Sequence, residues 1–312
     1  MKVLIFTHKN DIDGMGNAIL ANLAYEEVDF ELCGTFNLTE NILKYYDKGS
    51  IYNYDKVYVT DLCIEEPLLS RIANDEILRE KFLDIDHHKT YDNEKYTKHN
   101  FIKVQLSNER GLTCGTSLFY EHLVKEDLID ENNLAIKEFV ELTRQHDTYE
   151  WKNIYNNQKS RELSILFDAV GCYGYIDLMI KKLRNNKTFE FDDIEKLLIN
   201  NRIIQINDKL KEYSKKVIYR DILGLRAGIV FITYEYRNEL ADYFKDNNFD
   251  MDFAMMIAPD PGVVAYRSVK PGVHVRPVAE FFGGKGHEKA ATNPITEEMQ
   301  NNLVKVLTRK NN

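Results

Sequence analysis

Short apolar runs alternate with amphipathic segments along the first third of the chain. Lys2–Thr7 is a β-rich apolar run, and apolar residues recur at helical spacing over Met15–Glu27. Strands are predicted again at Phe30–Gly34, Lys56–Asp61 and Lys81–Ile85, and helices at Leu38–Tyr46 and Pro67–Lys81. Strands that alternate with helices at this spacing predict an α/β domain, in which helices cover both faces of a parallel sheet.

The pattern becomes helical after residue 113 and β-rich again from Ile218. Helices are predicted over Leu118–Val124 and Leu134–Trp151, and a long polar-faced helix over Asp192–Val217. Later strands are predicted at Gly228–Tyr234, Phe253–Ala258 and Val263–Arg267, with helices at Glu235–Lys245 and Pro277–Phe282. We therefore expect an N-terminal parallel-sheet domain over residues 1–190, a helical linker over residues 191–217, and a smaller α+β domain over residues 218–312.

Length and composition are those of a folded protein with two domains. The chain has 312 residues, of which 44% are hydrophobic and 29% are charged. A net charge of −9 disfavours a protein that grips long nucleic acid through a broad basic surface. No run approaches the roughly 18 apolar residues of a membrane span, and the N-terminus becomes polar too early for a secretory signal. We expect a soluble cytoplasmic protein without a membrane partner.

Four cysteines are scattered along the chain without a C-x-x-C pair. Neither a thiolate zinc site nor a disulfide framework is indicated by this spacing. Buried small side chains explain the cysteines most simply.

Aspartate and histidine follow three of the predicted strands. His8-Lys9-Asn10-Asp11-Ile12-Asp13-Gly14 follows the first strand, Asp61 closes the third, and Asp84-Ile85-Asp86-His87-His88 closes the next. Ligands of parallel α/β sheets bind beyond the carboxyl ends of the strands. An aspartate after a strand is often a helix cap or turn former, and for Asp61 alone that interpretation would be favoured. Carboxylates from three strand ends would repel one another unless cations lay between them.

The candidate ligands favour particular metals. A further carboxylate, Asp147, follows Arg144-Gln145-His146 in a helical context. Oxygen and imidazole ligands without thiolates fit Mn²⁺, with Mg²⁺, Co²⁺ or Zn²⁺ as alternatives. Two such ions about 3.5–4 Å apart can activate water and clamp the attacking and leaving oxygens of a phosphoryl group. We expect Asp61 to bridge the two ions.

Two N-terminal motifs resemble those of a known family. Asp86-His87-His88 and Asp11-x-Asp13-Gly14-x-Gly16 are similar to motifs of the DHH/DHHA1 phosphoesterase superfamily, and above all of its oligoribonuclease branch. The resemblance implies two Mn²⁺ ions, one held by His8, Asp11 and Asp61 and the other by Asp13, Asp61, His87 and Asp147. It also implies that His88 contacts the scissile phosphate and stabilises the developing charge, that Asp61 is essential for catalysis, and that Asp86 supports these ligands.

The C-terminal part carries the second half of the resemblance. Gly283-Gly284-Lys285-Gly286-His287 is similar to the glycine-rich histidine segment of the family, and Tyr266-Arg267-Ser268 to the strand before it. The resemblance implies that a terminal phosphate of the substrate is bound by Arg267, Ser268, Gly283, Gly284, Lys285, Gly286 and His287. Glycines let backbone N–H groups approach an anion, and Arg267 and His287 can add charge-assisted hydrogen bonds. Two departures stand out: many relatives have one more residue between His8 and Asp11, and Lys285 replaces a glycine.

Together these patterns predict a metal-dependent phosphodiesterase or exonuclease. The expected reaction is hydrolysis of short oligoribonucleotides to nucleoside 5′-monophosphates. A linear or cyclic dinucleotide phosphodiesterase, or a phosphatase for 3′-phosphoadenosine 5′-phosphate, is an alternative on the same fold. A further alternative is a nucleotide-binding protein that has lost catalytic activity. Because relatives often form dimers, a homodimer is also possible for this chain.

Overall fold

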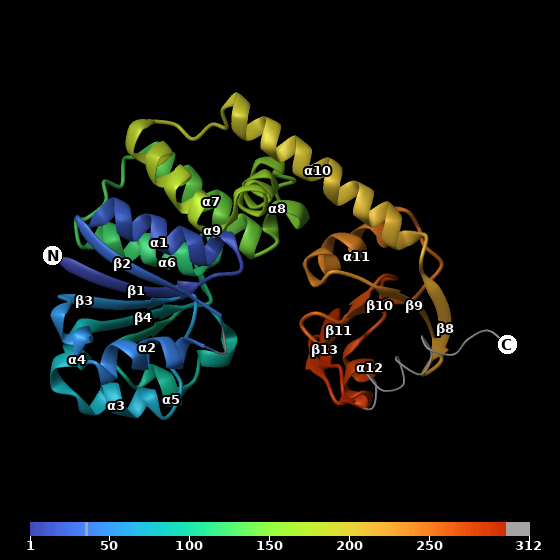
Figure 1. Ribbon diagram of the computed structural model, residues 1–312, viewed down its shortest axis with the longest axis horizontal. Coiled ribbons are helices and arrows are strands. Elements are labelled where there is room, and N and C mark those ends of the chain that lie inside the picture. Colours follow the sequence, from blue (N-terminus) through green and yellow to red (C-terminus); the bar gives the residue numbers. More distant parts are fainter. Residues whose placement is uncertain (35–36, 298–312) are drawn as a thin grey trace. The chain divides into compact units, whose positions relative to one another are not determined.

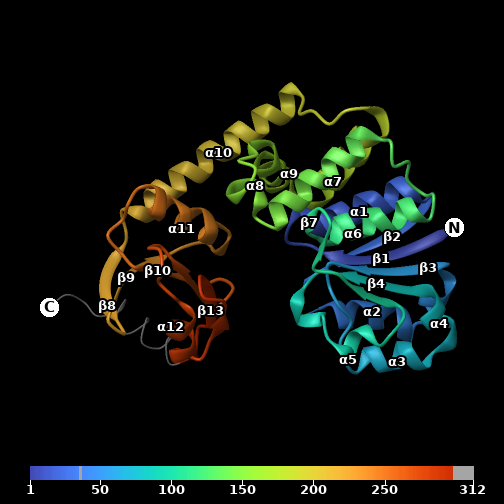
Figure 2. The ribbon, with the colours of Figure 1, turned by 180° about the vertical axis from the view of Figure 1, so that it is seen from behind.

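The computed structural model describes residues 1–34 and 37–297 (Figures 1 and 2). The chain divides into two compact units, the first covering Met1–Arg202 and the second beginning at Ile203. The division lies inside one long helix, α10 (Asp193–Ser214). This helix occupies most of the segment that was expected to link two domains.

A parallel sheet of five strands forms the centre of the first unit, in the order β2-β1-β3-β4-β5. Its strands are β1 (Lys2–His8), β2 (Glu27–Cys33), β3 (Lys56–Thr60), β4 (Phe82–Asp86) and β5 (Ile102–Val104). The central strand β1 is buried from Val3 to Thr7. Strands that are covered on both faces are nearly continuous apolar runs in sequence, and β1 has this pattern.

Helices cover both faces of this sheet (Figure 1). One face carries α1 (Ile12–Ala24) and α6 (Gly115–Lys125), and beyond them lie α7 (Leu134–Asp147), α8 (Glu150–Asn153) and α9 (Gln158–Asn185). The other face carries α2 (Leu38–Asp47), α3 (Leu68–Asn74), α4 (Glu76–Lys81) and α5 (Glu94–Thr97), with the short helices η1 (Ser50–Asn53) and η2 (Lys89–Tyr91). The predicted α/β fold is confirmed.

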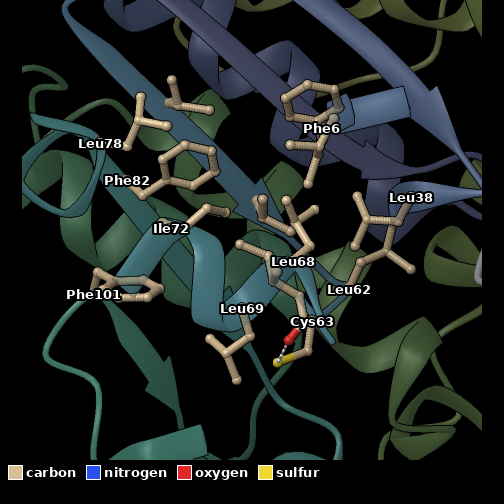
Figure 3. Packing of buried hydrophobic residues seen from close by; sticks show 14 of the residues in the cluster. Phe6, Leu38, Leu62, Cys63, Leu68, Leu69, Ile72, Leu78, Phe82 and Phe101 are labelled. Carbon is tan, nitrogen blue, oxygen red and sulfur yellow. Dashed lines mark hydrogen bonds between the residues drawn. The ribbon is translucent and has the colours of Figure 1, made fainter. Parts of the chain in front are cut away.

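The core beneath the second face joins strands to helices across short connections. Figure 3 shows Phe6 of β1 and Phe82 of β4 in one buried cluster with Leu68 and Ile72 of α3 and with Leu78 of α4. These five side chains are nearly inaccessible to solvent. Burial of side chains of this size stabilises the fold by roughly 1.5–3 kcal/mol each, and it holds β1 and β4 against the helices of this face.

Three helix boundaries differ from the predicted ones, each for a local reason. Helix α1 begins at Ile12 rather than Met15, because Asp11 caps it by accepting a hydrogen bond from the Gly14 backbone. The segment predicted as one helix over Pro67–Lys81 is two helices, since Asp75 caps a new start at Glu76. The helix predicted over Leu134–Trp151 ends at Asp147, before the left-handed residue Tyr149.

Helix α9 was not predicted from the sequence. Among the described residues it alone is long and apolar enough to be considered as a membrane span by length and composition. However, Gly171 adopts φ 73° and ψ 171°, which divides the helix into residues 158–170 and 172–185. Each part is well short of the roughly 20 residues that cross a bilayer. Both parts belong to the helical layer of the first unit, where α9 packs against α1 and α7.

A mixed sheet of six strands forms the second unit, in the order β12-β13-β11-β10-β9-β8. Its strands are β8 (Ile218–Ile222), β9 (Leu225–Phe231), β10 (Phe253–Ala258), β11 (Val263–Ser268), β12 (Lys285–Gly286) and β13 (Ala290–Pro294). Among the described strands of this sheet, only β9 and β10 pair in parallel. The helices of the unit up to residue 297 are α11 (Arg237–Asp246), α12 (Arg276–Phe281) and the short η3 (Tyr234–Tyr236). The expected α+β class is confirmed, although β8, β12 and β13 were not predicted.

Candidate metal centre

Three neighbouring strands of the first unit end at the same level. Thr7 of β1 pairs with Thr60 of β3, and Thr60 pairs with Ile85 of β4. The next residues along the three strands are His8, Asp61 and Asp86. Parallel register therefore places one ionisable side chain from each strand in a row at the carboxyl edge of the sheet.

Asp61 lies in the middle of this row. Its side chain is 4% exposed, its Oδ2 lies 3.6 Å from Nδ1 of His8, and its Oδ1 lies 3.3 Å from Nε2 of His87. Within residues 1–34 and 37–297 the buried Oδ2 has no hydrogen-bond partner. The backbone is left-handed, with φ 57°, and Asp61 caps no helix of the described chain. A buried carboxylate oxygen without a hydrogen bond is costly unless a cation compensates it, so Asp61 is more than a turn former.

The first group of ligand atoms comes from β1, β3 and the start of α1. Nδ1 of His8 lies 2.8 Å from Oδ2 of Asp11, whose other oxygen accepts the Gly14 N–H at 3.0 Å. Burial lowers the pKa of His8, but the hydrogen bond to Asp11 and the nearby carboxylate of Asp61 outweigh this effect and raise it to about 10. Positive charge is therefore strongly favoured between these carboxylates, and a divalent cation would supply it in place of the proton.

The second group is built around His87. Its Nε2 lies 3.7 Å from Oδ2 of Asp13, and its Nδ1 lies 3.7 Å from Oδ2 of Asp147. Burial lowers the pKa of His87, while Asp61, Asp13 and Asp147 raise it, with a net value of about 10. Burial and the neighbouring carboxylate of Asp61 raise the pKa of Asp13 to about 6. Burial and the charge of Asp13 raise the pKa of Asp147 well above its usual range.

Asp13 is held by the start of another helix. Asp13 and Gly14 themselves lie in the first turn of α1. The N-terminus of α6 grips its carboxylate, because the Gly115 N–H donates to Oδ2 and the Thr116 N–H donates to Oδ1, both at 2.7 Å. The hydroxyl of Thr116 donates to the Asp13 carbonyl at 2.6 Å. These two N–H groups of the α6 terminus are therefore engaged with Asp13.

Two glycines permit this close packing. A Cβ on Gly14 would lie 1.8 Å from the carbonyl oxygen of His8, and a Cβ on Gly115 would lie 2.8 Å from Cβ of Asp61 and 3.0 Å from Oδ2 of Asp13. Gly14 is therefore required for contact between α1 and β1. The cradle of Gly115 and Thr116 was not predicted from the sequence.

His88 is oriented by Asp86. Nδ1 of His88 lies 2.7 Å from Oδ1 of Asp86, which also accepts the His87 N–H at 2.8 Å. The hydrogen bond to Asp86 raises the pKa of His88. Half of the His88 side chain is exposed, at 49%, whereas Asp86 is fully buried. Because Nδ1 is engaged by Asp86, Nε2 is the ring nitrogen left for a substrate group, and Nδ1 lies 4.0 Å from Oδ1 of Asp61.

Side-chain packing or helix capping accounts for the positions of the nearby residues His146, Ser117 and Cys114. His146, which adjoins Asp147, stacks on Trp151 with an angle of 9° between the rings, and burial lowers its pKa to about 4. Ser117 accepts the Cys114 N–H through its hydroxyl and completes the cap of α6. Neither His146 nor Cys114 belongs to a group of converging ligand atoms within the described residues.

The donor set fits divalent cations. His8, Asp11 and Asp61 form one group, and Asp13, His87 and Asp147 form another, with the ligand atoms of each group within 4.8 Å of one another. A third group overlaps them and consists of Asp61, Asp86, His87 and His88. The six side chains of the first two groups offer carboxylate oxygens and imidazole nitrogens, which suit Mn²⁺ and related ions. All of the predicted ligands therefore meet at one edge of the sheet, and Asp61 adjoins both groups.

The second unit places the predicted phosphate-binding residues around β11–β13. Ala290 of β13 pairs with Arg267 of β11, and its carbonyl accepts the His287 N–H at 2.8 Å. Arg267 and His287 therefore flank the same residue. Ser268 is mostly buried, and its hydroxyl donates to the carbonyl of Lys270.

The glycines of this loop serve backbone packing. The N–H groups of Gly283 and Gly284 donate to the carbonyls of Glu280 and Ala279. A Cβ on Gly284 would lie 2.3 Å from the Thr292 carbonyl oxygen, and one on Gly286 would lie 2.4 Å from Cα of Ala291. The expectation that the N–H groups of Gly283 and Gly284 face an anion is wrong. The side chains of Lys285 and His287 are exposed.

Known proteins resemble this chain in sequence and in fold. No family model matches the chain. The oligoribonuclease NrnB of Bacillus subtilis (strain 168) is 28% identical over 297 residues, which cover 95% of this chain and 73% of that protein. A solved structure of the pGpG-specific phosphodiesterase PggH from Vibrio cholerae matches with a TM-score of 0.54 and 14% identity over 98% of this chain and 97% of that chain.

A manganese-bound structure of the exonuclease RecJ matches with a TM-score of 0.53 and 10% identity, covering 99% of this chain and 90% of that chain. The resemblance to the DHH/DHHA1 phosphoesterase superfamily is confirmed. At these identities the two solved structures support the fold alone. The sequence similarity to the curated relative extends over 95% of this chain. The DHH tripeptide of this superfamily is Asp86-His87-His88 here, and it closes β4.

Proposed function

We propose that this chain is a metal-dependent phosphodiesterase that hydrolyses short oligoribonucleotides and releases nucleoside 5′-monophosphates. The observation that carries the proposal is the convergence of six carboxylate and imidazole side chains, with Asp61 in the middle, at the carboxyl edge of the sheet. Support for the substrate class comes from the names of two relatives, an oligoribonuclease and a pGpG-specific phosphodiesterase. Both names describe enzymes that act on short oligonucleotides.

Two Mn²⁺ ions are the proposed cofactors, with Mg²⁺ or Co²⁺ as substitutes. His8, Asp11 and Asp61 would hold one ion, and Asp13, Asp61, His87 and Asp147 would hold the other. When bound, such ions lower the pKa of water and neutralise charge on a phosphoryl group. The buried Oδ2 of Asp61, which lacks a hydrogen bond within the described chain, supports this assignment.

The protein's own contribution to the reaction centres on His88. Because Asp86 binds Nδ1 and favours the protonated ring, Nε2 can donate a hydrogen bond to a non-bridging oxygen of the scissile phosphate. Such a donor stabilises charge that develops on the phosphate in the transition state. Asp86 is already bonded to the backbone of His87, so the ring is oriented before substrate arrives.

Residues of the second unit would bind the other end of the substrate. Lys285 and His287 present exposed side chains, and Arg267 flanks the same strand residue as His287. Cationic and imidazole side chains suit a terminal phosphate. The role proposed for Gly283, Gly284 and Gly286 is to shape this loop, while Ser268 supports the strand that carries Arg267.

A hydrolysis panel in Mn²⁺ tests the proposal. The substrates are the linear dinucleotide pApA, longer RNA, cyclic dinucleotides, 3′-phosphoadenosine 5′-phosphate and pyrophosphate, and each product is identified. We expect the highest kcat/KM on RNA of two to a few nucleotides, with adenosine 5′-monophosphate as the product of pApA. Preference for a cyclic dinucleotide or for 3′-phosphoadenosine 5′-phosphate would favour those alternatives. Tight nucleotide binding without hydrolysis of any substrate would indicate a protein without turnover.

A further inference from the structure

We propose that Arg144 is a positioning residue that fixes the second group of metal ligands by anchoring Asp13 and Asp147 through one guanidinium. The inference rests on the proposed two-metal function and deepens it. Arg144 touches neither carboxylate itself. It acts through the two segments that present them, the end of α7 and the start of α6.

The guanidinium of Arg144 is almost completely buried and is bonded on three sides. Nε and Nη2 donate to the two oxygens of Glu141 at 2.9 and 2.7 Å, which is a forked pair within α7. Nη1 donates to Oε2 of Glu150 at 2.7 Å and to the carbonyl of Leu112 at 2.9 Å. The Arg144 side chain is 4% exposed, and that of Glu150 is 10% exposed. A buried planar fork with this many bonds fixes the positions of all its partners.

One of these bonds spans the turn that follows Asp147. Asp147 is the last residue of α7, Tyr149 adopts a left-handed φ of 61°, and Glu150 begins α8. The Arg144 carbonyl accepts hydrogen bonds from both the N–H and the hydroxyl of Thr148. Arg144 therefore holds the turn at two points, through its backbone carbonyl and through its side chain. These bonds fix the direction in which Asp147 points toward His87.

The bond to Leu112 reaches the segment that holds Asp13. Leu112 lies in β7 (Gly111–Leu112), which pairs with β6 (Ser107–Asn108). Three and four residues later, the N–H groups of Gly115 and Thr116 grip the Asp13 carboxylate.

The hairpin and α8 also lie against each other. Gly111 adopts φ 120°, and a Cβ there would lie 3.2 Å from Oε1 of Glu150. Asp13 and Asp147, which are far apart in sequence, therefore share one anchor.

The first group of ligands is built without this anchor. His8 and Asp11 come from β1 and the start of α1, and their hydrogen bonds run to each other, to Asn10 and to Gly14. Loss of the Arg144 fork should therefore weaken one of the two Mn²⁺ ions selectively. A residue that merely stabilises the fold would affect both ions equally or neither.

The test uses Arg144→Lys and Arg144→Met in the full chain. Lys keeps the charge but lacks the planar fork, and Met removes both. Lys182→Met is the matched control, because Lys182 forms another buried ion pair of the first unit, with Glu195 at 2.8 Å and side chains 6% and 2% exposed. Mn²⁺ binding is followed by titration calorimetry on the metal-free protein, and kcat and KM are measured with pApA.

We expect wild type and Lys182→Met to bind two Mn²⁺ ions alike, even if the control unfolds at a lower temperature. Arg144→Lys should keep one ion at wild-type affinity and bind the other about 10–100-fold more weakly, as expected when a supporting residue behind the ligands is changed. Its kcat should fall at low Mn²⁺ and recover as Mn²⁺ is raised, with KM little changed. Arg144→Met should show the same selectivity with a larger loss.

Each other outcome has a defined meaning. Two ions at wild-type affinity in both Arg144 variants, or equal weakening of both ions, would overturn the inference while leaving the proposed function in place. A wild-type protein that binds no Mn²⁺ and hydrolyses nothing would instead reject the proposed function. If Arg144→Met does not fold, Glu150→Gln takes its place and should weaken the same single ion.

Discussion

Asp61 and His87 lie side by side at the ends of neighbouring strands, with Oδ1 of Asp61 3.3 Å from Nε2 of His87. The other oxygen of Asp61 faces His8 at 3.6 Å. One carboxylate thus adjoins both groups of ligand atoms. Its position depends on the register of β1, β3 and β4 and on its own left-handed backbone. A change at Asp61 should therefore affect both proposed ions at once.

Asp61→Asn should abolish turnover without unfolding the protein. Asn tolerates the left-handed φ of 57° and matches Asp in size, so the strand end keeps its shape. Loss of the shared charge should lower kcat by more than about 100-fold, because several kcal/mol of charge stabilisation depend on it. Asp127→Asn is the control, since Asp127 is exposed and has the same φ of 57°. Activity near wild type in Asp61→Asn would reject Asp61 as a shared ligand.

Gly115→Ala should damage the site by steric displacement alone. The added Cβ would approach Cβ of Asp61 to 2.8 Å and Oδ2 of Asp13 to 3.0 Å, so at least one carboxylate must shift. We expect kcat/KM on pApA to fall at least about tenfold, because sub-ångström misplacement of reacting groups is costly. Gly174→Ala is the matched control, since a Cβ there meets the Val170 side chain at an ordinary 3.5 Å in an exposed part of α9. Equal activity of both variants would show that the Asp13 cradle is unimportant.

Much of this centre could be predicted from strand ends. Apolar runs located β1, β3 and β4, and the rule that ligands bind at carboxyl ends selected His8, Asp61 and Asp86. The cradle around Asp13 could not be predicted in the same way. It depends on tertiary contact between α1 and α6, about 100 residues apart, and hydrophobic periodicity carries no information on such contacts.

The missed elements have local causes. Helix α9 contains Gly171-Cys172-Tyr173-Gly174, and the break at Gly171 interrupts the helical pattern of this segment. Strand β12 is only two residues long, Lys285–Gly286, and depends on pairing with β13. The expectations of a homodimer and of a cytoplasmic location stay predictions.

The metal-free protein should lose stability as pH rises from 6.5 toward 9. His8 and His87 have pKa values of about 10 when folded, above the unfolded value of 6.5. The folded state therefore binds these protons more tightly, and the stability that they contribute is complete below pH 6.5 and is lost as pH approaches 10. Within this window each imidazole contributes a slope of about 1.4 kcal/mol per pH unit.

Mn²⁺ should oppose this loss, because it replaces the same protons and binds more tightly as they leave. The measurement is the unfolding temperature between pH 6.5 and 9, in EDTA and in Mn²⁺. We expect a fall with pH in EDTA and an increase caused by Mn²⁺ that grows with pH. His87→Asn should flatten the EDTA profile, while His274→Asn, at an exposed position of the second unit, should not. A Mn²⁺ effect that shrinks with pH would contradict the assignment of His8 and His87 as ligands.

Lys285→Ala and His287→Ala should separate substrate binding from chemistry. Both side chains are exposed on the loop proposed to bind the terminal phosphate, and neither belongs to the metal centre. Loss of one charge-assisted hydrogen bond, about 1.5–3 kcal/mol, should raise KM for pApA roughly 10–100-fold. Hydrolysis of bis(p-nitrophenyl) phosphate, which has no terminal phosphate, should stay at the wild-type rate. Lys245→Ala removes an exposed lysine from α11 of the same unit and should change neither activity.

An equal loss of activity on both substrates would place the effect of the Lys285 and His287 variants in the catalytic step. An unchanged KM for pApA would show that this loop is not part of the substrate site.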